Sequence, residues 1–98
     1  MHLRLWRFTV SPGTEAQFLA AYRSDGDWAR LFATAPGFIR TELWRAEDGS
    51  CMTADYWDSL DAFEQFQARQ GTEYRRLDAE LEGFAGVETF IGAFDLVG

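Results

Sequence analysis

The two halves of the chain resemble each other at a fixed offset of 46 residues, and this internal repeat restricts the possible folds more than any other feature. A duplicated unit of this length has room for two strands and the helix between them. Seven positions match without a gap: Trp28 with Tyr74, Arg30 with Arg76, Leu31 with Leu77, Gly37 with Gly83, Phe38 with Phe84, Glu42 with Glu88 and Trp44 with Phe90. The repeat therefore predicts a fold built from two copies of one supersecondary unit.

Four segments have the composition and alternation of β-strands. Residues 2–10 and 38–45 are the strands of the first unit, and residues 51–58 and 87–97 are those of the second. Residues 46–50 (AEDGS) join the two units as a hairpin turn. Each unit thus contributes one strand at each of its ends.

Two helical regions lie between these strands, and each is interrupted once. The first covers residues 13–23, with Ser11 as N-cap and Pro12 in its first turn. The helix resumes after Gly26, with Asp27 as a new cap, and stops at Pro36-Gly37. The second region begins with a helix over residues 59–69, in which Leu60, Phe63 and Phe66 or Gln67 face inward. It continues with a helix over residues 72–82 that ends at Gly83.

The element order is therefore βαββαβ, with no linker and no low-complexity segment. Two split βαβ units predict an α+β ferredoxin-like sandwich, in which a four-stranded antiparallel sheet carries both helices on one face. We expect residues 1–98 to form a single domain.

Both faces of this sheet carry apolar side chains. Because two helices cover only one face, we expect a second copy to cover the other, giving a two-fold homodimer through the sheet face. Strand alternation assigns the following groups to opposite faces: Phe38 and Trp44 against Ile39 and Leu43, and Phe90 and Phe94 against Thr89, Ile91 and Ala93.

Composition excludes several classes of partner. The 98 residues have a net charge of -7, which would repel the phosphates of nucleic acid and an anionic membrane surface. No apolar run is long enough to span a membrane and the N-terminus does not resemble a signal peptide, so a cytoplasmic location is expected. Aromatic residues make up 16%, more than so small a chain buries easily, which favours a partner subunit or an apolar ligand.

The absence or scarcity of certain residue types further limits the catalytic chemistry that is available. All nine basic residues are Arg and the chain contains no Asn, so neither a lysine Schiff base nor an asparagine amide is available. Cys51 has no disulfide partner and is expected to be a buried, inert thiol. His2 is expected at an exposed terminus, and one His without a cysteine cluster predicts no metal site.

Three segments carry a resemblance to a known family: PGFIRTELWR (36–45), YWDSLDAFEQF (56–66) and EYRRLD (73–78). Nearly the whole chain resembles the antibiotic biosynthesis monooxygenase (ABM) domain family, whose members form dimeric α/β barrels. The family includes cofactor-free oxygenases of aromatic polyketides, haem-degrading enzymes, quinol oxygenases and domains with no established chemistry.

For an oxygenase, the resemblance implies a site on the third strand. A deprotonated phenol or enol passes an electron to oxygen without metal or flavin, provided that the protein supplies an apolar cavity, a proton acceptor and an oxyanion donor. Trp57 matches the family's pocket tryptophan, and alternation places Thr53 and Asp55 on the same strand face. With no dinucleotide-binding fingerprint, the expected reaction needs no cofactor. The residues expected to bind a small aromatic substrate are Tyr22, Phe63, Tyr74, Trp44 and Arg40.

The chain departs from the polyketide oxygenases at two positions, with Thr53 in place of an asparagine and Phe63 in place of a tyrosine. The Asn, Trp and His set of haem-degrading members is incomplete here. Two alternatives stay open for single residues. Asp55 is either a base with a pKa raised by burial or the ion-pair partner of an Arg on a neighbouring strand, such as Arg40, and Trp57 is either a pocket wall or plain core.

Three functions fit these observations. The first is a cofactor-independent monooxygenase that acts on an electron-rich phenol, anthrone or quinol. The second is a non-catalytic binding or accessory protein that holds an aromatic ligand. The third is a cofactor-free lyase or cyclase in which Asp55 or a tyrosine moves protons.

Overall fold

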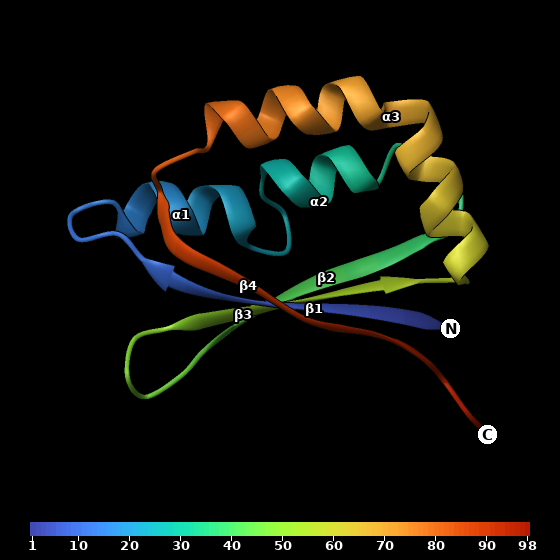
Figure 1. Ribbon diagram of the computed structural model, residues 1–98, viewed down its shortest axis with the longest axis horizontal. Helices are drawn as coiled ribbons and strands as arrows, with labels where there is room; N and C mark the ends of the chain where they lie inside the picture. The colour runs from blue at the N-terminus through green and yellow to red at the C-terminus, as the bar shows by residue number, and fades with distance from the viewer.

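The computed structural model describes all 98 residues, and its elements follow the predicted order. Figure 1 shows the helices stacked over one face of a twisted sheet, with both termini at the same end of the molecule. The elements are β1 (His2–Val10), α1 (Glu15–Tyr22), α2 (Asp27–Phe32), β2 (Phe38–Arg45), β3 (Cys51–Trp57), α3 (Leu60–Glu80) and β4 (Ala85–Asp95).

The sheet has the strand order β2-β3-β1-β4, and every neighbouring pair is antiparallel. This arrangement confirms the predicted ferredoxin-like βαββαβ fold. We call the face of the sheet turned away from the helices the open face. None of the helices has the length and apolar character needed to cross a membrane.

The edge strand β2 contains a bulge that corrects one of the predicted face assignments. Phe38 pairs with Trp57, but Arg40 pairs with the next residue back, Tyr56, so one extra residue is inserted in β2. An extra residue inverts the alternation beyond it. Phe38 therefore faces the helices whereas Trp44 lies on the open face, and the prediction that these two side chains share a face is wrong.

The other edge strand, β4, corrects the second assignment in the same way. Leu5 pairs with Gly92 and Trp6 pairs with Phe90, which leaves an extra residue between the two partners on β4. Phe90 consequently faces the helices beside Trp6, with 4.9 Å between the ring centroids. Phe94 lies on the open face, so the prediction that Phe90 and Phe94 share a face is also wrong.

Two predicted helix caps are displaced by a few residues. Thr14 rather than Ser11 precedes α1, and the Thr14 hydroxyl donates to the carbonyl oxygens of Ser11 (2.8 Å) and Phe84 (3.0 Å). Gly26 rather than Asp27 precedes α2. Thr14 therefore ties the start of α1 to the segment that leads into β4.

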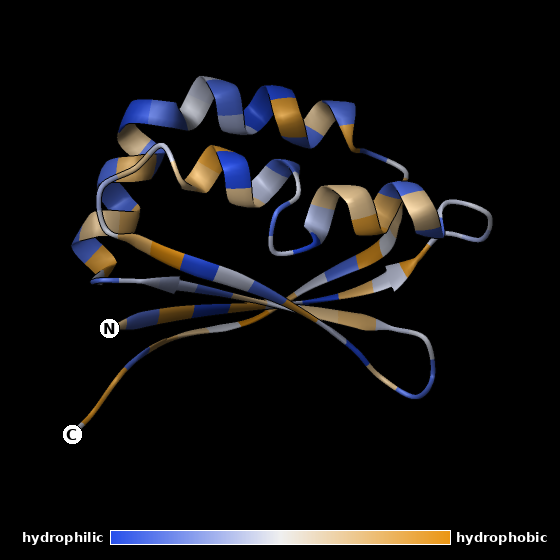
Figure 2. Ribbon diagram, turned by 180° about the vertical axis from the view of Figure 1, so that it is seen from behind, coloured by the Kyte–Doolittle hydropathy of each residue, from blue (hydrophilic) through white to orange (hydrophobic).

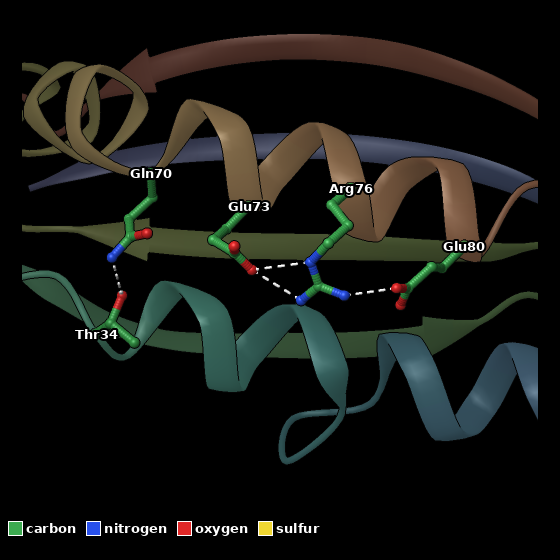
Figure 3. A network of polar contacts seen from close by, with 5 residues as sticks. All are labelled: Thr34, Gln70, Glu73, Arg76 and Glu80. Atoms are coloured by element: carbon green, nitrogen blue, oxygen red, sulfur yellow. Dashed lines mark hydrogen bonds and ion pairs between the residues drawn. The ribbon is translucent and has the colours of Figure 1, made fainter.

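The helix α3 changes direction at Gln70, whose φ of -116° and ψ of 18° are not helical. This kink is the interruption predicted between residues 59–69 and 72–82. The Gln70 side-chain amide donates to the Thr34 hydroxyl (3.4 Å), and Arg76 forms ion pairs with Glu73 and Glu80 along the exposed side of the second half, as Figure 3 shows. The kink lets the two halves of α3 cover different parts of the sheet.

The first half of α3 closes a solid aromatic cluster around Trp57, which is fully buried. The Trp57 ring centroid lies between 5.2 and 5.6 Å from the centroids of its four aromatic neighbours, and its Nε1–H has no hydrogen-bond partner. Figure 2 shows hydrophobic residues recurring along the strands and many hydrophilic ones on α3. Leu60 is exposed, contrary to prediction, whereas Cys51 is buried as predicted. The four aromatic neighbours of the Trp57 ring are Phe32, Phe38, Phe63 and Phe66.

Candidate functional site

A cavity lies between the sheet and the helices and opens to solvent. The cavity itself has a volume of about 50 Å³, and the empty space in and around its mouth, open solvent included, amounts to about 450 Å³. Its walls are mainly aromatic, and its charged lining residues are all acidic. The lining consists of Trp6, Phe8, Tyr22, Trp28, Phe32, Thr41, Thr53, Asp55, Tyr74, Asp78 and Glu88.

Asp55 is the buried charge on the sheet side of this cavity. It is 8% exposed, and Thr41 on the neighbouring strand β2 donates a hydrogen bond from its hydroxyl to Asp55 Oδ1. Burial raises the pKa of Asp55 to about 6, and the Thr41 hydrogen bond and the charge of Arg4 offset this rise only in part. A carboxyl group with this pKa accepts a proton and returns it readily near neutral pH.

Arg4 is the basic residue nearest in register to Asp55, but the Arg4 guanidinium forms no ion pair with the Asp55 carboxylate. The two residues pair across β1 and β3, yet they form no ion pair. The Arg4 guanidinium instead lies 3.9 Å from the Phe63 ring centroid and 5.0 Å from that of Phe90. These cation–π contacts hold the positive charge outside the cavity lining.

The wall opposite the sheet comes from the helices. Trp28 on α2 and Tyr74 on α3, which are equivalent positions of the sequence repeat, face each other with 4.9 Å between ring centroids. The Trp28 Nε1–H is buried and has no hydrogen-bond partner in the protein. Burial raises the pKa of Tyr22, and the nearby Trp28 indole offsets this rise without the geometry of a hydrogen bond. Trp28 therefore lines the cavity while its Nε1–H stays buried behind the ring surface that the cavity reaches.

Two carboxylates line the cavity from separate elements, Asp78 on the second half of α3 and Glu88 on β4. The Tyr22 hydroxyl lies 3.5 Å from Glu88 Oε1, at the limit of a hydrogen bond. Burial and the negative charge of Asp78 raise the pKa of Glu88, which the Tyr22 hydroxyl offsets in part. Since both side chains are exposed and also border an adjoining surface depression, we refer to them as the mouth carboxylates.

The structure brings half of the predicted site residues together. Thr53, Asp55, Tyr22 and Tyr74 all line the cavity. Trp57 is absent from the lining, so the prediction of a cavity bordered by Trp57 is wrong. The reason is that the aromatic cluster under the first half of α3 fills the space around the indole. The predicted residues outside the lining are Trp57 and Phe63 in the solid cluster, and Trp44 and Arg40 on the open face.

The alternative pairing of Asp55 with Arg40 is also wrong. The β2 bulge turns Arg40 to the open face, where its guanidinium lies 4.1 Å from the Tyr56 ring centroid and its Nε donates to Glu42 (3.4 Å). Asp55 faces the helices on the other side of the sheet. The two residues are therefore separated by the sheet itself.

The expectation that His2 is exposed is contradicted as well. His2 is 2% exposed, and its Nδ1 lies 2.8 Å from Asp95 Oδ1 on β4. Since β4 pairs with the whole of β1, the first residues of the chain lie inside the sheet. His2 sits near Phe63, beyond the residues that line the cavity.

Several lining residues were missed in the sequence. Thr41 is the most important, and the bulge that turns it toward Asp55 has no marker in the β2 sequence. Trp28 was available as the repeat partner of Tyr74, which the sequence predicts as a substrate-binding residue. The acidic residues Asp78 and Glu88 meet only through the tertiary structure, and no spacing in the sequence relates them.

Comparisons with known proteins agree with this architecture. The family model "Antibiotic biosynthesis monooxygenase" matches residues 1–77. SnoaB, a cofactor-independent oxygenase from Streptomyces nogalater, is 26% identical, with 99% of this chain and 93% of SnoaB covered and a TM-score of 0.72. No curated protein matches the sequence.

A second solved structure shares the fold at lower identity. It is a monooxygenase from the gene ActVA-Orf6 of Streptomyces coelicolor, in complex with the ligand nanaomycin D, with 19% identity. The comparison covers 99% of this chain and 88% of that protein, with a TM-score of 0.70. On the strength of the family model and of the fold, this chain belongs to the antibiotic biosynthesis monooxygenase family.

Proposed function

We propose that this protein is a cofactor-independent monooxygenase that oxidises an electron-rich aromatic molecule, such as a phenol, an anthrone or a quinol. The observation that carries the proposal is Asp55, a buried carboxyl group with a pKa of about 6 at the edge of an aromatic-walled cavity. The likeness to SnoaB, which is a cofactor-independent oxygenase, supports it. A carboxyl group held in this state costs stability, so a role in proton transfer explains why it is there.

In this reaction Asp55 removes a proton from the substrate and leaves an electron-rich anion in the cavity. The anion transfers an electron to O₂, and the resulting substrate radical and superoxide combine to a peroxide anion. Asp55 returns the proton to give a hydroperoxide, and loss of water from it leaves a carbonyl group. One oxygen atom thus enters the substrate and the other leaves as water, and the substrate supplies all the electrons.

The cavity provides two further requirements of this chemistry. Aromatic walls lower the local polarity, which strengthens each polar interaction inside the cavity. The Thr53 hydroxyl lines the cavity and is the donor that we assign to the negative charge that develops on oxygen. Loss of one good oxyanion donor typically costs about 10²–10³-fold in rate, so a hydroxyl in place of an amide at position 53 favours slow turnover.

Oxygen uptake by metal-stripped protein tests the proposal on a panel of anthrones, naphthols and quinols. We expect uptake without added cofactor, and we expect Asp55→Asn to lower it by about 10²-fold or more because general base catalysis is lost. Glu64→Gln removes an exposed carboxylate on α3 outside the cavity and serves as the control. Uptake that requires iron, flavin or NADPH would contradict the mechanism, and tight binding without uptake would favour a binding protein.

We further propose that the functional unit is a homodimer formed through the open face. Trp44 is 56% exposed and Phe94 is 49% exposed, and both belong to this face by register. Exposed apolar patches of this kind usually mark an interface. Sedimentation equilibrium at micromolar concentration should give twice the mass of the 11.2 kDa chain, and Trp44→Asp should give monomers. Leu60→Asp, at an exposed apolar position on α3, should leave the dimer intact; a wild-type monomer would refute the proposal.

A further inference from the structure

The charges that line the cavity are all negative, and none of them is neutralised by an ion pair. Seven of the thirteen other acidic residues lie within 4 Å of an arginine, as Glu73 and Glu80 do with Arg76. Asp55, Asp78 and Glu88 form no such pair. A ligand in this cavity therefore meets carboxylate groups both at the sheet and at the mouth.

The arginines closest to these groups point elsewhere. Arg4 lies over the rings of Phe63 and Phe90 and does not line the cavity. Arg75 borders the surface depression outside the mouth, but its guanidinium donates to the Thr72 hydroxyl (3.5 Å), one turn back along α3. Glu82 adds a further acidic residue to that depression. The approach to the cavity is thus acidic as well.

The arrangement of donors and acceptors also has a direction. At the sheet, Asp55 is an acceptor for a substrate hydroxyl. At the mouth, the carboxylates of Asp78 and Glu88 offer acceptors only, and burial together with the negative charge of Asp78 raises the pKa of Glu88. The mouth therefore favours a group that donates hydrogen bonds or carries positive charge.

We propose that Asp78 and Glu88 select the ligand by its charge. The cavity takes phenolic aromatics whose far end carries an ammonium or a hydroxyl group, and it rejects those whose far end carries a carboxylate. The inference rests on the proposed function, because it places the phenol end of the ligand at Asp55.

Three naphthol probes test this selection. They share the ring and the phenol and differ in one distal substituent, which is aminomethyl, hydroxymethyl or carboxylate. Tryptophan fluorescence quenching gives their affinities for the wild-type protein and for the double variant Asp78→Asn/Glu88→Gln. The control is Glu47→Gln/Glu64→Gln, which changes the net charge equally at two exposed positions outside the cavity.

We expect the cationic probe to bind most tightly and the anionic probe most weakly, with roughly tenfold between the extremes at low salt. The double variant should remove this order, the control should keep it, and added salt should weaken it. Equal affinities in the wild-type protein, or an order that survives in the double variant, would overturn the charge selection. Oxygen uptake with the hydroxymethyl probe, lost in Asp55→Asn, reports on the proposed function separately. Charge selection is therefore refuted on its own if uptake depends on Asp55 but the three affinities are equal.

Discussion

The helix-covered face of the sheet has a solid end around Trp57 and a hollow end around Asp55, although these two residues are only two positions apart on β3. Strand alternation sends both side chains to the same face, yet aromatic rings surround one of them and a cavity lies beside the other. The difference comes from α3. The first half of α3 places Phe63 and Phe66 against Trp57. The second half of α3, beyond the kink at Gln70, contributes Tyr74 to the cavity wall.

This comparison shows what decides whether a cluster of aromatic residues becomes a core or a binding site. Both ends contain a buried tryptophan whose indole Nε1–H has no partner, Trp57 at the solid end and Trp28 at the hollow end. An unpaired donor by itself therefore does not identify a site. Of the two residues only Trp28 lines the cavity, although its Nε1 atom is buried as well.

The largest effect that separates the two ends is expected from truncation of the tryptophans. Trp57→Ala should lower the free energy of unfolding by about 3–5 kcal/mol, because it leaves a void among close-packed rings. Trp28→Ala should cost less, since one side of that ring already borders the cavity, and it should weaken binding of aromatic ligands. Urea denaturation of both variants measures the difference. Equal losses of stability would mean that the hollow end is as tightly packed as the solid end.

The fold was predictable because its signals are local or periodic. The 46-residue repeat, the strand alternation and the glycine and proline stops determine the order βαββαβ, and the structure follows it. The face of the sheet to which each edge-strand side chain points was harder to predict from the sequence. Gly86 marks one irregularity of β4, because a Cβ there would lie 2.6 Å from Thr9 Oγ1, but the extra residue that separates the faces of Phe90 and Phe94 is Ile91. The extra residue of β2 lies at Ile39, a good strand former that gives no such sign.

The site was predictable only in part, for a related reason. Thr53 and Asp55 were placed correctly since β3 is a central strand without a bulge. Trp57 was misplaced because alternation predicts a face but not the packing above it, which depends on the direction that α3 takes after Gln70. Arg40 was misplaced by one inserted residue. The wrong predictions thus concern residues whose position depends on a bulge in an edge strand or on how a helix packs on the sheet.

An intermediate effect is expected from the buried charge at the hollow end. Since the pKa of Asp55 is raised to about 6 in the folded protein, the folded state binds this proton more tightly than the unfolded chain does. Ionisation therefore makes the free energy of unfolding fall as the pH rises from about 4 to 6, by up to about 3 kcal/mol. Asp55→Asn should remove this decrease and stabilise the protein at neutral pH.

Denaturant titrations at a series of pH values measure the effect. Asp58→Asn, which removes an exposed carboxylate just beyond the same strand, is the matched control and should keep the pH dependence of the wild-type protein. If Asp55→Asn destabilises the protein at neutral pH, the ionised carboxylate is satisfied in the folded state. The interpretation of Asp55 as a poised base would then fail.

The smallest expected effect distinguishes the two threonines beside Asp55. The Thr41 hydroxyl donates to the Asp55 carboxylate, and this bond lowers a pKa that burial has raised. In Thr41→Val the donor is lost while the shape of the side chain is kept, so the pKa of Asp55 should rise further. Thr53→Val changes a cavity-lining hydroxyl that is not bonded to Asp55 and should leave that pKa close to its wild-type value. Carbon NMR titration of the Asp55 carboxyl group follows both variants without relying on turnover. A downward shift in Thr41→Val, or equal upward shifts in both variants, would show that the hydrogen bond across β2 and β3 does not control this carboxyl group, and that burial in the hollow end acts alone.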